Sequence, residues 1–332
     1  FWKEGINKNM SFIEVKDLKV HYPIRGGFFN KVIDHVYAVD GVSLTIEEGK
    51  TYGLVGESGS GKSTIGKAII GLEKIKSGKI IYEGKKIDGK FRNRRSEYNR
   101  NVQMIFQDSL SSLNPKKRVI DLISEPLRNF ENLTSDEEKR KVSELLEIVG
   151  MNREDIYKYP HEFSGGQRQR LGIARAVATK PKLIIADEPV SALDLSVQAQ
   201  VLNYMKDIQE QFGLSYLFIS HDLGVVKHMC DYMFIMYHGR FVETGEKNDI
   251  YKNPEHFYTK RLIAAIPEIH PEKRAENKRR RLKIEKEYLA NEKKYYDENG
   301  RVFDLKKLTD THFVAFKDKN LRNNGNSEKG GK

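Results

Sequence analysis

A glycine-rich segment of nine residues constrains the fold of this chain more than any other feature. Its residues are Gly56, Glu57, Ser58, Gly59, Ser60, Gly61, Lys62, Ser63 and Thr64, in the pattern GxxxxGK[ST]. The apolar run at 52–55 predicts a buried strand before it, and residues 63–71 predict a helix after it. A strand, a glycine turn and a helix in this order are typical of a P-loop nucleotide-binding site.

The residue types in this segment suit phosphate chemistry. Glycines let the backbone curl so that several N–H groups face phosphate oxygens, and the next helix adds unpaired N–H groups at its positive end. Lys62 supplies a positive charge for the β and γ phosphates, and Ser63 offers a hydroxyl to Mg²⁺. The motif alone fits a kinase, a GTPase or a motor.

Two further segments extend this site. The apolar run at 183–186 predicts a buried parallel strand and ends in Asp187 and Glu188. Asp187 is expected near Mg²⁺, and Glu188 is placed to activate a water as a general base. The segment Ser164, Gly165, Gly166 and Gln167 precedes a helical pattern and predicts a second anion site. Because the first site is complete, we expect the second to serve a nucleotide held by another subunit.

Strands alternating with helices indicate an α/β core. Residues 135–150 predict a helix with a capping box of Ser135 and Glu138, and residues 196–212 predict another. Residues 108–175 predict a helical insertion. The other strand patterns lie at 13–20, 42–46, 78–83 and 216–219, and Gly26-Gly27 is expected in a loop.

The order of these motifs resembles the nucleotide-binding subunits of ABC transporters over about residues 13–245. The resemblance implies a RecA-like P-loop NTPase core with an antiparallel β subdomain, a helical signature subdomain and a C-terminal extension. It implies that Gln107 touches Mg²⁺ or water, that residues 164–167 close on the opposite subunit's ATP, and that Asp194 ends the D-loop. His221 would contact the γ phosphate.

Carried over in this way, the candidate catalytic residues are Glu188, His221, Lys62 and Gln107, and the candidate metal ligands are Ser63, Gln107 and Asp187. ABC domains also stack adenine on an aromatic residue near the N-terminus. Tyr22 is the first choice, because it follows the first strand pattern, and Tyr37 is the alternative, because it lies closer to the phosphate loop in sequence.

Three stretches, at 107–115, 190–200 and 253–267, resemble the ATPases of oligopeptide and dipeptide permeases, although Ser109 stands where that subfamily has Pro. The insertion at 25–35 resembles the second of their two ATPases. The resemblance implies an oligopeptide importer of the bacterial plasma membrane, with this subunit at the cytoplasmic face. Its partners would be a second homologous ATPase, two transmembrane permease subunits and an extracytoplasmic peptide-binding protein.

Some relatives hold an iron–sulfur cluster on tail cysteines. Here Phe316 stands where a cysteine is expected, and Cys230 is the single cysteine, so we expect no cluster. A dipeptide, nickel or glutathione importer is an alternative. A soluble ABC ATPase that acts on nucleic acid or ribosomes is a second one, disfavoured because a single cassette is present and no long arm separates Gln107 from Ser164.

The basic charge of the chain is concentrated near its end. The net charge is +11, and residues 271–332 hold 18 Lys and Arg against 11 Asp and Glu. Because acids are interleaved with the bases, a solvated mixed-charge surface is favoured over a nucleic-acid site. We expect a disordered leader at 1–11, the ATPase domain at 12–250, and a basic, partly flexible extension at 251–332.

Overall fold

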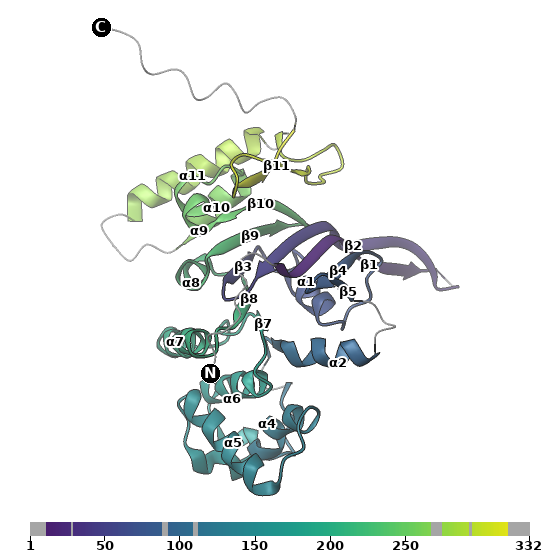
Figure 1. The fold of residues 1–332 in the computed structure, drawn as a ribbon. Coiled ribbons are helices and arrows are strands. Elements are labelled where there is room, and N and C mark those ends of the chain that lie inside the picture. Colours follow the sequence, from purple (N-terminus) through teal and green to yellow (C-terminus); the bar gives the residue numbers. More distant parts are fainter. Residues whose placement is uncertain are drawn as a thin grey trace.

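An eight-stranded sheet forms the centre of the computed structural model (Figure 1), which describes residues 11–27, 29–87, 92–108, 112–266, 274–291 and 294–317. The strand order is β11-β12-β10-β9-β3-β8-β7-β6, and β9, β3, β8, β7 and β6 run parallel. The strands are β3 Thr51–Val55, β6 Val102–Ile105, β7 Leu183–Asp187, β8 Ser215–Ser220, β9 Tyr232–Tyr237, β10 Arg240–Glu246, β11 Leu305–Lys307 and β12 Phe313–Ala315. The predicted α/β class is confirmed.

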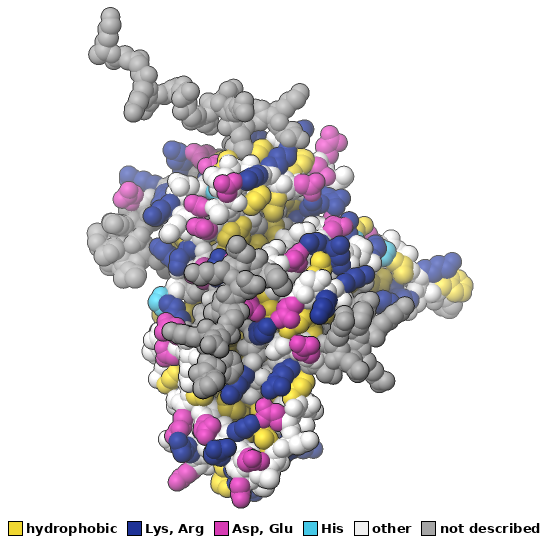
Figure 2. All heavy atoms as spheres, viewed as in Figure 1, with side chains coloured by type: hydrophobic (Ala, Val, Ile, Leu, Met, Phe, Trp, Pro, Cys, Tyr) yellow, Lys and Arg dark blue, Asp and Glu magenta, His cyan; other side chains and the backbone are white. Residues whose placement is uncertain are grey.

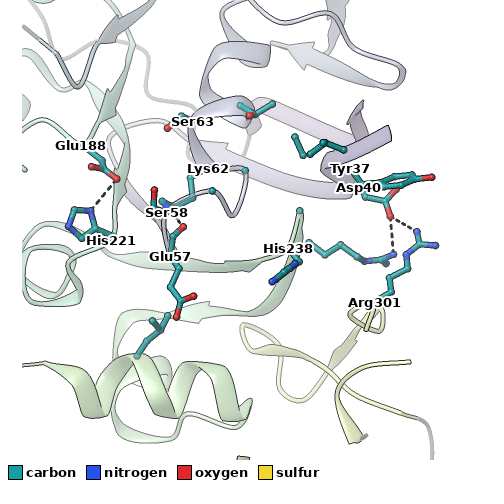
Figure 3. Close-up of a pocket in the computed structure, with 18 of the residues that line it drawn as sticks. Tyr37, Asp40, Glu57, Ser58, Lys62, Ser63, Glu188, His221, His238 and Arg301 are labelled. Carbon is teal, nitrogen blue, oxygen red and sulfur yellow. Dashed lines mark hydrogen bonds and ion pairs between the residues drawn. The ribbon is translucent and has the colours of Figure 1, made fainter. Parts of the chain in front are cut away.

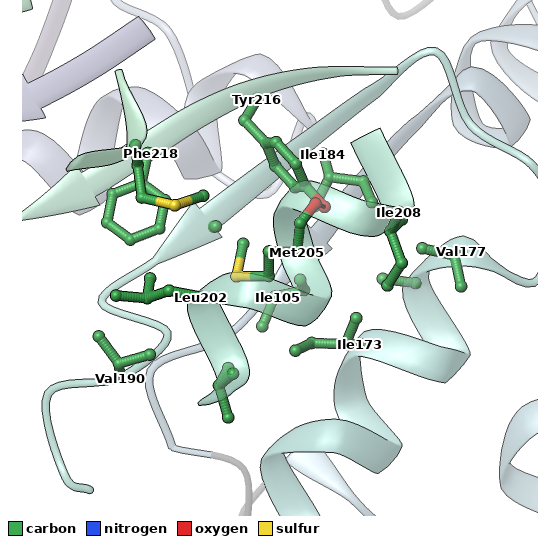
Figure 4. Close-up of a cluster of buried hydrophobic side chains, with 14 of the residues drawn as sticks. Ile105, Ile173, Val177, Ile184, Val190, Leu202, Met205, Ile208, Tyr216 and Phe218 are labelled. Atoms are coloured by element: carbon green, nitrogen blue, oxygen red, sulfur yellow. Dashed lines mark hydrogen bonds between the residues drawn. The ribbon is translucent and has the colours of Figure 1, made fainter. Parts of the chain in front are cut away.

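The largest apolar cluster lies between this sheet and two helices, α6 (Gly165–Val177) and α7 (Leu195–Phe212). In α7, Met205 and Ile208 lie one turn apart and face Tyr216 of β8 (Figure 4). The Tyr216 hydroxyl donates to the carbonyl of Met205 at 3.1 Å, so the buried phenol keeps a partner. This packing fixes the ends of β7 and β8, where Glu188 and His221 follow.

A second, antiparallel sheet has the order β2-β1-β4-β5. Its strands are β1 Ser11–Gly26, β2 Lys31–Glu47, β4 Ser77–Tyr82 and β5 Lys85–Ile87. The strands β1 and β2 extend well beyond the predicted strands at 13–20 and 42–46 and continue as a hairpin, in which Gly27 lies in the turn as expected and Gly26 ends β1. Within the described part of the chain, β4 pairs only with the inner part of β1, and the side chains of the outer part of the hairpin are mostly exposed. The sequence there therefore lacks the alternation of a half-buried strand.

The predicted helical insertion contains α4 (Val119–Arg128), α5 (Ser135–Ile148), two 3₁₀ turns (Arg153–Tyr157 and Pro160–Glu162) and most of α6. The predicted capping box is displaced by one residue. Thr134 is the N-cap of α5, and its partner is Glu137. Glu138 instead turns inward and pairs with Arg128, which holds α4 against α5.

The C-terminal extension joins the central sheet. It contains α9 (Lys247–Lys252), α10 (Phe257–Ala265) and α11 (Arg274–Asn291), while β12 pairs with β10. His312 and Glu243 form a buried pair across this junction, with Nε2 and Oε1 2.7 Å apart. The remaining helices are α1 Lys62–Ile69, α2 Arg92–Asn101 and α8 Leu223–Met229. The strand β1 begins at residue 11, and the rest of the expected leader lies outside the described residues.

Charges of both signs are interspersed over the face that Figure 2 shows. In the extension, Arg281 donates to the last carbonyls of α10, including Ala265 at 3.2 Å, and Arg261 pairs with Glu285 at 2.9 Å. These basic groups therefore contribute to packing. Among the residues that the structure describes, no helix is both long enough and apolar enough to cross a membrane.

Candidate active site

The glycine-rich loop connects β3 to α1 and folds around its own lysine. Lys62 is almost fully buried, and its Nζ donates to the carbonyl oxygens of Gly56 and Glu57, each at 2.7 Å. A Cβ on Gly61 would lie 2.0 Å from the carbonyl oxygen of Ala38, so only glycine fits this close approach. Burial lowers the pKa of Lys62, and the nearby carboxylates of Glu188 and Asp187 oppose this shift.

The start of α1 and the end of β7 meet through a hydrogen bond. Ser63 Oγ donates to Asp187 Oδ1 at 2.8 Å. Burial raises the pKa of Asp187, and the bond from Ser63 works in the opposite direction. A hydroxyl and a carboxylate side by side are the oxygen ligands that Mg²⁺ prefers. The residues present therefore fit the predicted metal.

Glu188 lies at the centre of a group of three side chains. Its Oε2 accepts from Gln107 Nε2 at 2.8 Å, and its Oε1 lies 3.1 Å from His221 Nδ1. Its backbone is in the left-handed region, with φ of 47°, and its N–H donates to Ile219 at 2.9 Å. The turn after β7 thus directs Glu188 toward Gln107, which follows β6, and His221, which follows β8.

These residues face a cavity of about 1050 Å³ with two ends (Figure 3). The phosphate end contains most of the loop together with Gln107, Glu188 and His221, whereas Gly56, Ser60 and Asp187 do not line the cavity. The other end, which we name the distal end, contains Tyr37, Asp40, His238 and Arg301. The structure thus brings together the predicted residues Glu57, Ser58, Gly59, Gly61, Lys62, Ser63, Thr64, Gln107, Glu188 and His221.

The two candidate aromatic residues differ in position. Tyr37 lines the cavity and is half exposed, whereas Tyr22 is outside the lining. The Tyr22 hydroxyl instead interacts with Thr64 and Glu73, and burial together with Glu73 raises its pKa. The lining of the cavity therefore favours Tyr37, which was the alternative candidate, over Tyr22 as the residue that stacks on adenine.

Residues of the C-terminal extension also reach the site. The Tyr258 hydroxyl accepts from the backbone N–H of Glu57 at 3.0 Å, and Tyr258 is fully buried. Leu262, Asn299 and Arg301 line the cavity. Sequence reasoning missed Tyr258 and these three lining residues as site residues. Tyr258 and Leu262 lie in the stretch at 253–267, whose resemblance to peptide-permease ATPases was the only sequence feature that pointed to this region.

The second predicted anion site is separate from this cavity. Ser164 is the N-cap of α6, where its Oγ accepts from Gln167 N and its own N–H donates to Gln167 Oε1 at 2.9 Å. Gly166 is tightly packed, since a Cβ there would lie 2.4 Å from Val197. Asp194 is the exposed N-cap of α7. None of the four signature residues, nor Asp194, lines the cavity.

Comparison with known proteins agrees with this geometry. The model of the ABC transporter family matches residues 39–191, and that of the oligopeptide/dipeptide transporter C-terminal region matches residues 242–298. The oligopeptide transport ATP-binding protein OppF of Lactococcus lactis subsp. lactis is 58% identical over 91% of this chain and 95% of that protein. The oligopeptide transport ATP-binding protein AppF of Bacillus subtilis is 47% identical over 83% of this chain and 84% of that protein.

A solved structure, the dimeric ATP-binding cassette MJ0796 in a post-hydrolysis state with ADP and Pi, shares 25% sequence identity at a TM-score of 0.63. It covers 71% of this chain, and the match spans 98% of that cassette. The glycine loop, Asp187 and Glu188 lie within the first matched range, and α9, α10 and α11 lie within the second. The chain belongs to the ABC transporter family, among the ATP-binding proteins that carry the oligopeptide/dipeptide transporter C-terminal region.

Proposed function

We propose that this chain binds and hydrolyses ATP in the cavity and thereby powers an ABC importer of oligopeptides. The observation that carries the proposal is the convergence of Lys62, Ser63, Gln107, Glu188 and His221 on one cavity, with Asp187 hydrogen-bonded to Ser63. Each part matches a requirement of phosphoryl transfer to water: charge on the phosphates, oxygen ligands for a metal, and a base.

The phosphate end of the cavity would bind the triphosphate. Backbone N–H groups of residues 59–64 and Lys62 Nζ donate to phosphate oxygens, in exchange for the carbonyl contacts that Lys62 now makes. Ser63, Asp187 and Gln107 would hold Mg²⁺. When bound, that ion neutralises charge on the β and γ phosphates.

Glu188 is the proposed general base. Its two carboxylate oxygens contact Gln107 and His221, and each oxygen keeps a lone pair that can accept from a water. Glu188 takes a proton from that water as the water's oxygen bonds to the γ phosphorus and the bond to the ADP oxygen breaks. Gln107 and His221 orient the carboxylate, and His221 is also placed to contact the γ phosphate.

The signature residues would act on a second subunit's nucleotide. Ser164 and its neighbours present a helix N-terminus that lies outside this chain's own cavity. Leu195, next to Asp194, is 83% exposed, as expected for a surface that a partner covers. We assign the partner as a second homologous ATPase. ATP should drive association of the two subunits, and Ser164→Arg should abolish it, as analytical ultracentrifugation would show.

A groove on the helical side of the molecule is the proposed contact with the permease subunits. Leu72, Phe106 and Phe130 line it together with Glu125 and Arg175. Leu72 is 62% exposed, so a short permease helix would find an apolar floor with charges at its rim. This contact would place the chain at the cytoplasmic face of the membrane, and an extracytoplasmic binding protein would deliver the peptide.

The ATPase does not touch cargo, so transport itself is the test. A strain that lacks this chain should lose uptake of a labelled oligopeptide, and the wild-type chain, but not Lys62→Ala, should restore it. Uptake of labelled dipeptide, glutathione and nickel is measured in parallel. The glutathione import ATP-binding protein GsiA of Salmonella paratyphi A is 42% identical over 91% of this chain, which spans 48% of that protein. Loss of glutathione uptake with intact oligopeptide uptake would contradict the proposed cargo.

A further inference from the structure

The distal end of the cavity is formed partly by a tight turn of the C-terminal extension. Tyr296 pairs with Val302, and both are buried, which anchors the turn at its base. Asp297 Oδ1 accepts from the N–H groups of Asn299 and Arg301, at 2.9 and 2.8 Å. Gly300 has φ of 72°, a conformation that glycine adopts freely. The turn is therefore fixed by its own bonds, and it presents Asn299 and Arg301 to the cavity.

Arg301 is held at the cavity wall by a buried acid. Its Nη2 contacts Oδ2 of Asp40, a residue of β2 that is 7% exposed and more than 250 positions away in the sequence. Arg240 lies 3.7 Å from the same carboxylate and also pairs with Asp304. About half of the Arg301 side chain (53%) stays exposed. A guanidinium fixed on one edge keeps further N–H donors and a flat face for a ligand.

Both arginines that line this end are paired with carboxylates, of which Asp40 lines the cavity and Asp304 does not. Two arginines, Arg240 and Arg301, meet two acids, Asp40 and Asp304. Such a site suits an uncharged polar group better than a phosphate. Tyr37 adds an aromatic ring to the same wall. Two parts of a nucleotide are uncharged and polar in this way: the ribose carries hydroxyl groups, and the base is flat and accepts hydrogen bonds.

We infer that Arg301, presented by the turn at 297–301, contacts the ribose and base of the bound nucleotide, so that the C-terminal extension forms part of the nucleotide site. The inference rests on the proposed function, since it requires ATP in this cavity. Arg301 would then bind ATP directly, at the end of the cavity away from Glu188.

The test compares two ligands that share a triphosphate. Isothermal titration calorimetry of the full chain measures the affinity for Mg²⁺–ATP and for Mg²⁺–tripolyphosphate, which lacks ribose and base. Arg301→Ala should weaken ATP binding about tenfold and leave tripolyphosphate binding unchanged. Arg279→Ala, at an exposed residue of α11 that does not line the cavity, is the matched control and should change neither affinity.

Arg301→Gln is the second variant, because it retains a polar side chain at the turn. Asp40 keeps Arg240 and His21 as neighbours in both variants, so the fold should persist, as the melting temperature without ligand would show. Unchanged ATP affinity in both variants, or equal losses for the two ligands, would overturn the inference. Failure of the wild-type chain to bind ATP at all would instead contradict the proposed function.

Discussion

The two ends of the cavity are built in different ways. The phosphate end consists of residues on or directly after neighbouring parallel strands and the first turn of α1, and backbone groups supply much of its binding surface. The distal end is assembled from β2, the turn between β9 and β10, and the C-terminal extension. The first is fixed by the central sheet, and the second combines residues of β2 and of the turn between β9 and β10 with Leu262, Asn299 and Arg301 of the extension.

This difference separates the functions of the two ends. Damage to the phosphate end should affect every ligand that carries a triphosphate. Damage to the distal end should affect ATP alone, and it should leave the rate of the bound reaction nearly unchanged. Tripolyphosphate would contact one end only, so comparing it with ATP separates damage at the two ends.

Loss of the proposed base should have the largest effect. A positioned general base typically contributes about 10²- to 10⁴-fold in rate, so Glu188→Gln should lower the turnover of ATP by that factor while both ligands bind normally. Steady-state phosphate release measures the rate. Glu210→Gln, at an exposed residue of α7, serves as the control. Normal turnover in the Glu188 variant would show that another group is the base.

Lys62→Ala should weaken both ligands together. The buried ammonium is the fixed charge of the loop, and removing one partner of a buried charge pair costs about 2–5 kcal/mol. We expect an affinity loss on the order of 100-fold for ATP and for tripolyphosphate, measured by calorimetry. A loss confined to ATP would mean that the assignment of the two ends is reversed.

The distal end should reveal which tyrosine contacts the base. Stacking of a base on an aromatic ring contributes about 1–3 kcal/mol, so Tyr37→Ala should weaken ATP binding about tenfold with no change for tripolyphosphate. Tyr22→Ala, on the neighbouring strand, should have a smaller effect, because Tyr22 does not line the cavity. The reverse ranking would restore Tyr22 as the stacking residue.

Tyr258→Phe links the extension to the phosphate end. The change removes the acceptor for the Glu57 N–H, and a hydrogen bond of this kind contributes about 1 kcal/mol. ATP and tripolyphosphate should both bind about fivefold more weakly. Tyr216→Phe removes a buried hydroxyl from the core instead, so it should lower the melting temperature without changing either affinity. If Tyr258→Phe, like Tyr216→Phe, bound both ligands with wild-type affinity, Tyr258 would not position the loop.

The smallest effect concerns pH. The bond to Glu243 raises the pKa of His312 above its ordinary value of about 6.5. The protonated pair therefore stabilises the docked extension below pH 6.5, and this contribution is lost as pH rises through the raised pKa. His312→Asn should not show this pH-dependent loss of stability, because asparagine does not titrate. Glu243 still accepts from the N–H groups of Glu255 and His256 in the variant.

The measurement is the difference in melting temperature between wild type and His312→Asn from pH 6 to pH 9, and we expect it to shrink by about 2 °C. A wild-type advantage that grows with pH would contradict the assigned direction.

Most of the phosphate end could be predicted from sequence because each of its motifs consists of residues that are adjacent in the chain. Residues 56–64, Asp187 with Glu188, and His221 after β8 are each set by a strand end, and parallel strands bring their carboxyl ends to one edge. The distal end could not be predicted, because Asp40 and Arg301 meet across most of the chain. The length of the β1–β2 hairpin could not be predicted either. The side chains of its outer part are mostly exposed, so the sequence there does not alternate between apolar and polar residues.

One structure tests the central claim, that a single nucleotide joins the two ends. The Glu188→Gln variant of this chain with Mg²⁺–ATP should show the triphosphate on residues 59–64, and the base and ribose against Tyr37 and Arg301 of the same chain. Ser164 of a second subunit should cover the γ phosphate. A nucleotide whose base points away from the extension, or whose triphosphate is enclosed by one subunit alone, would contradict the account.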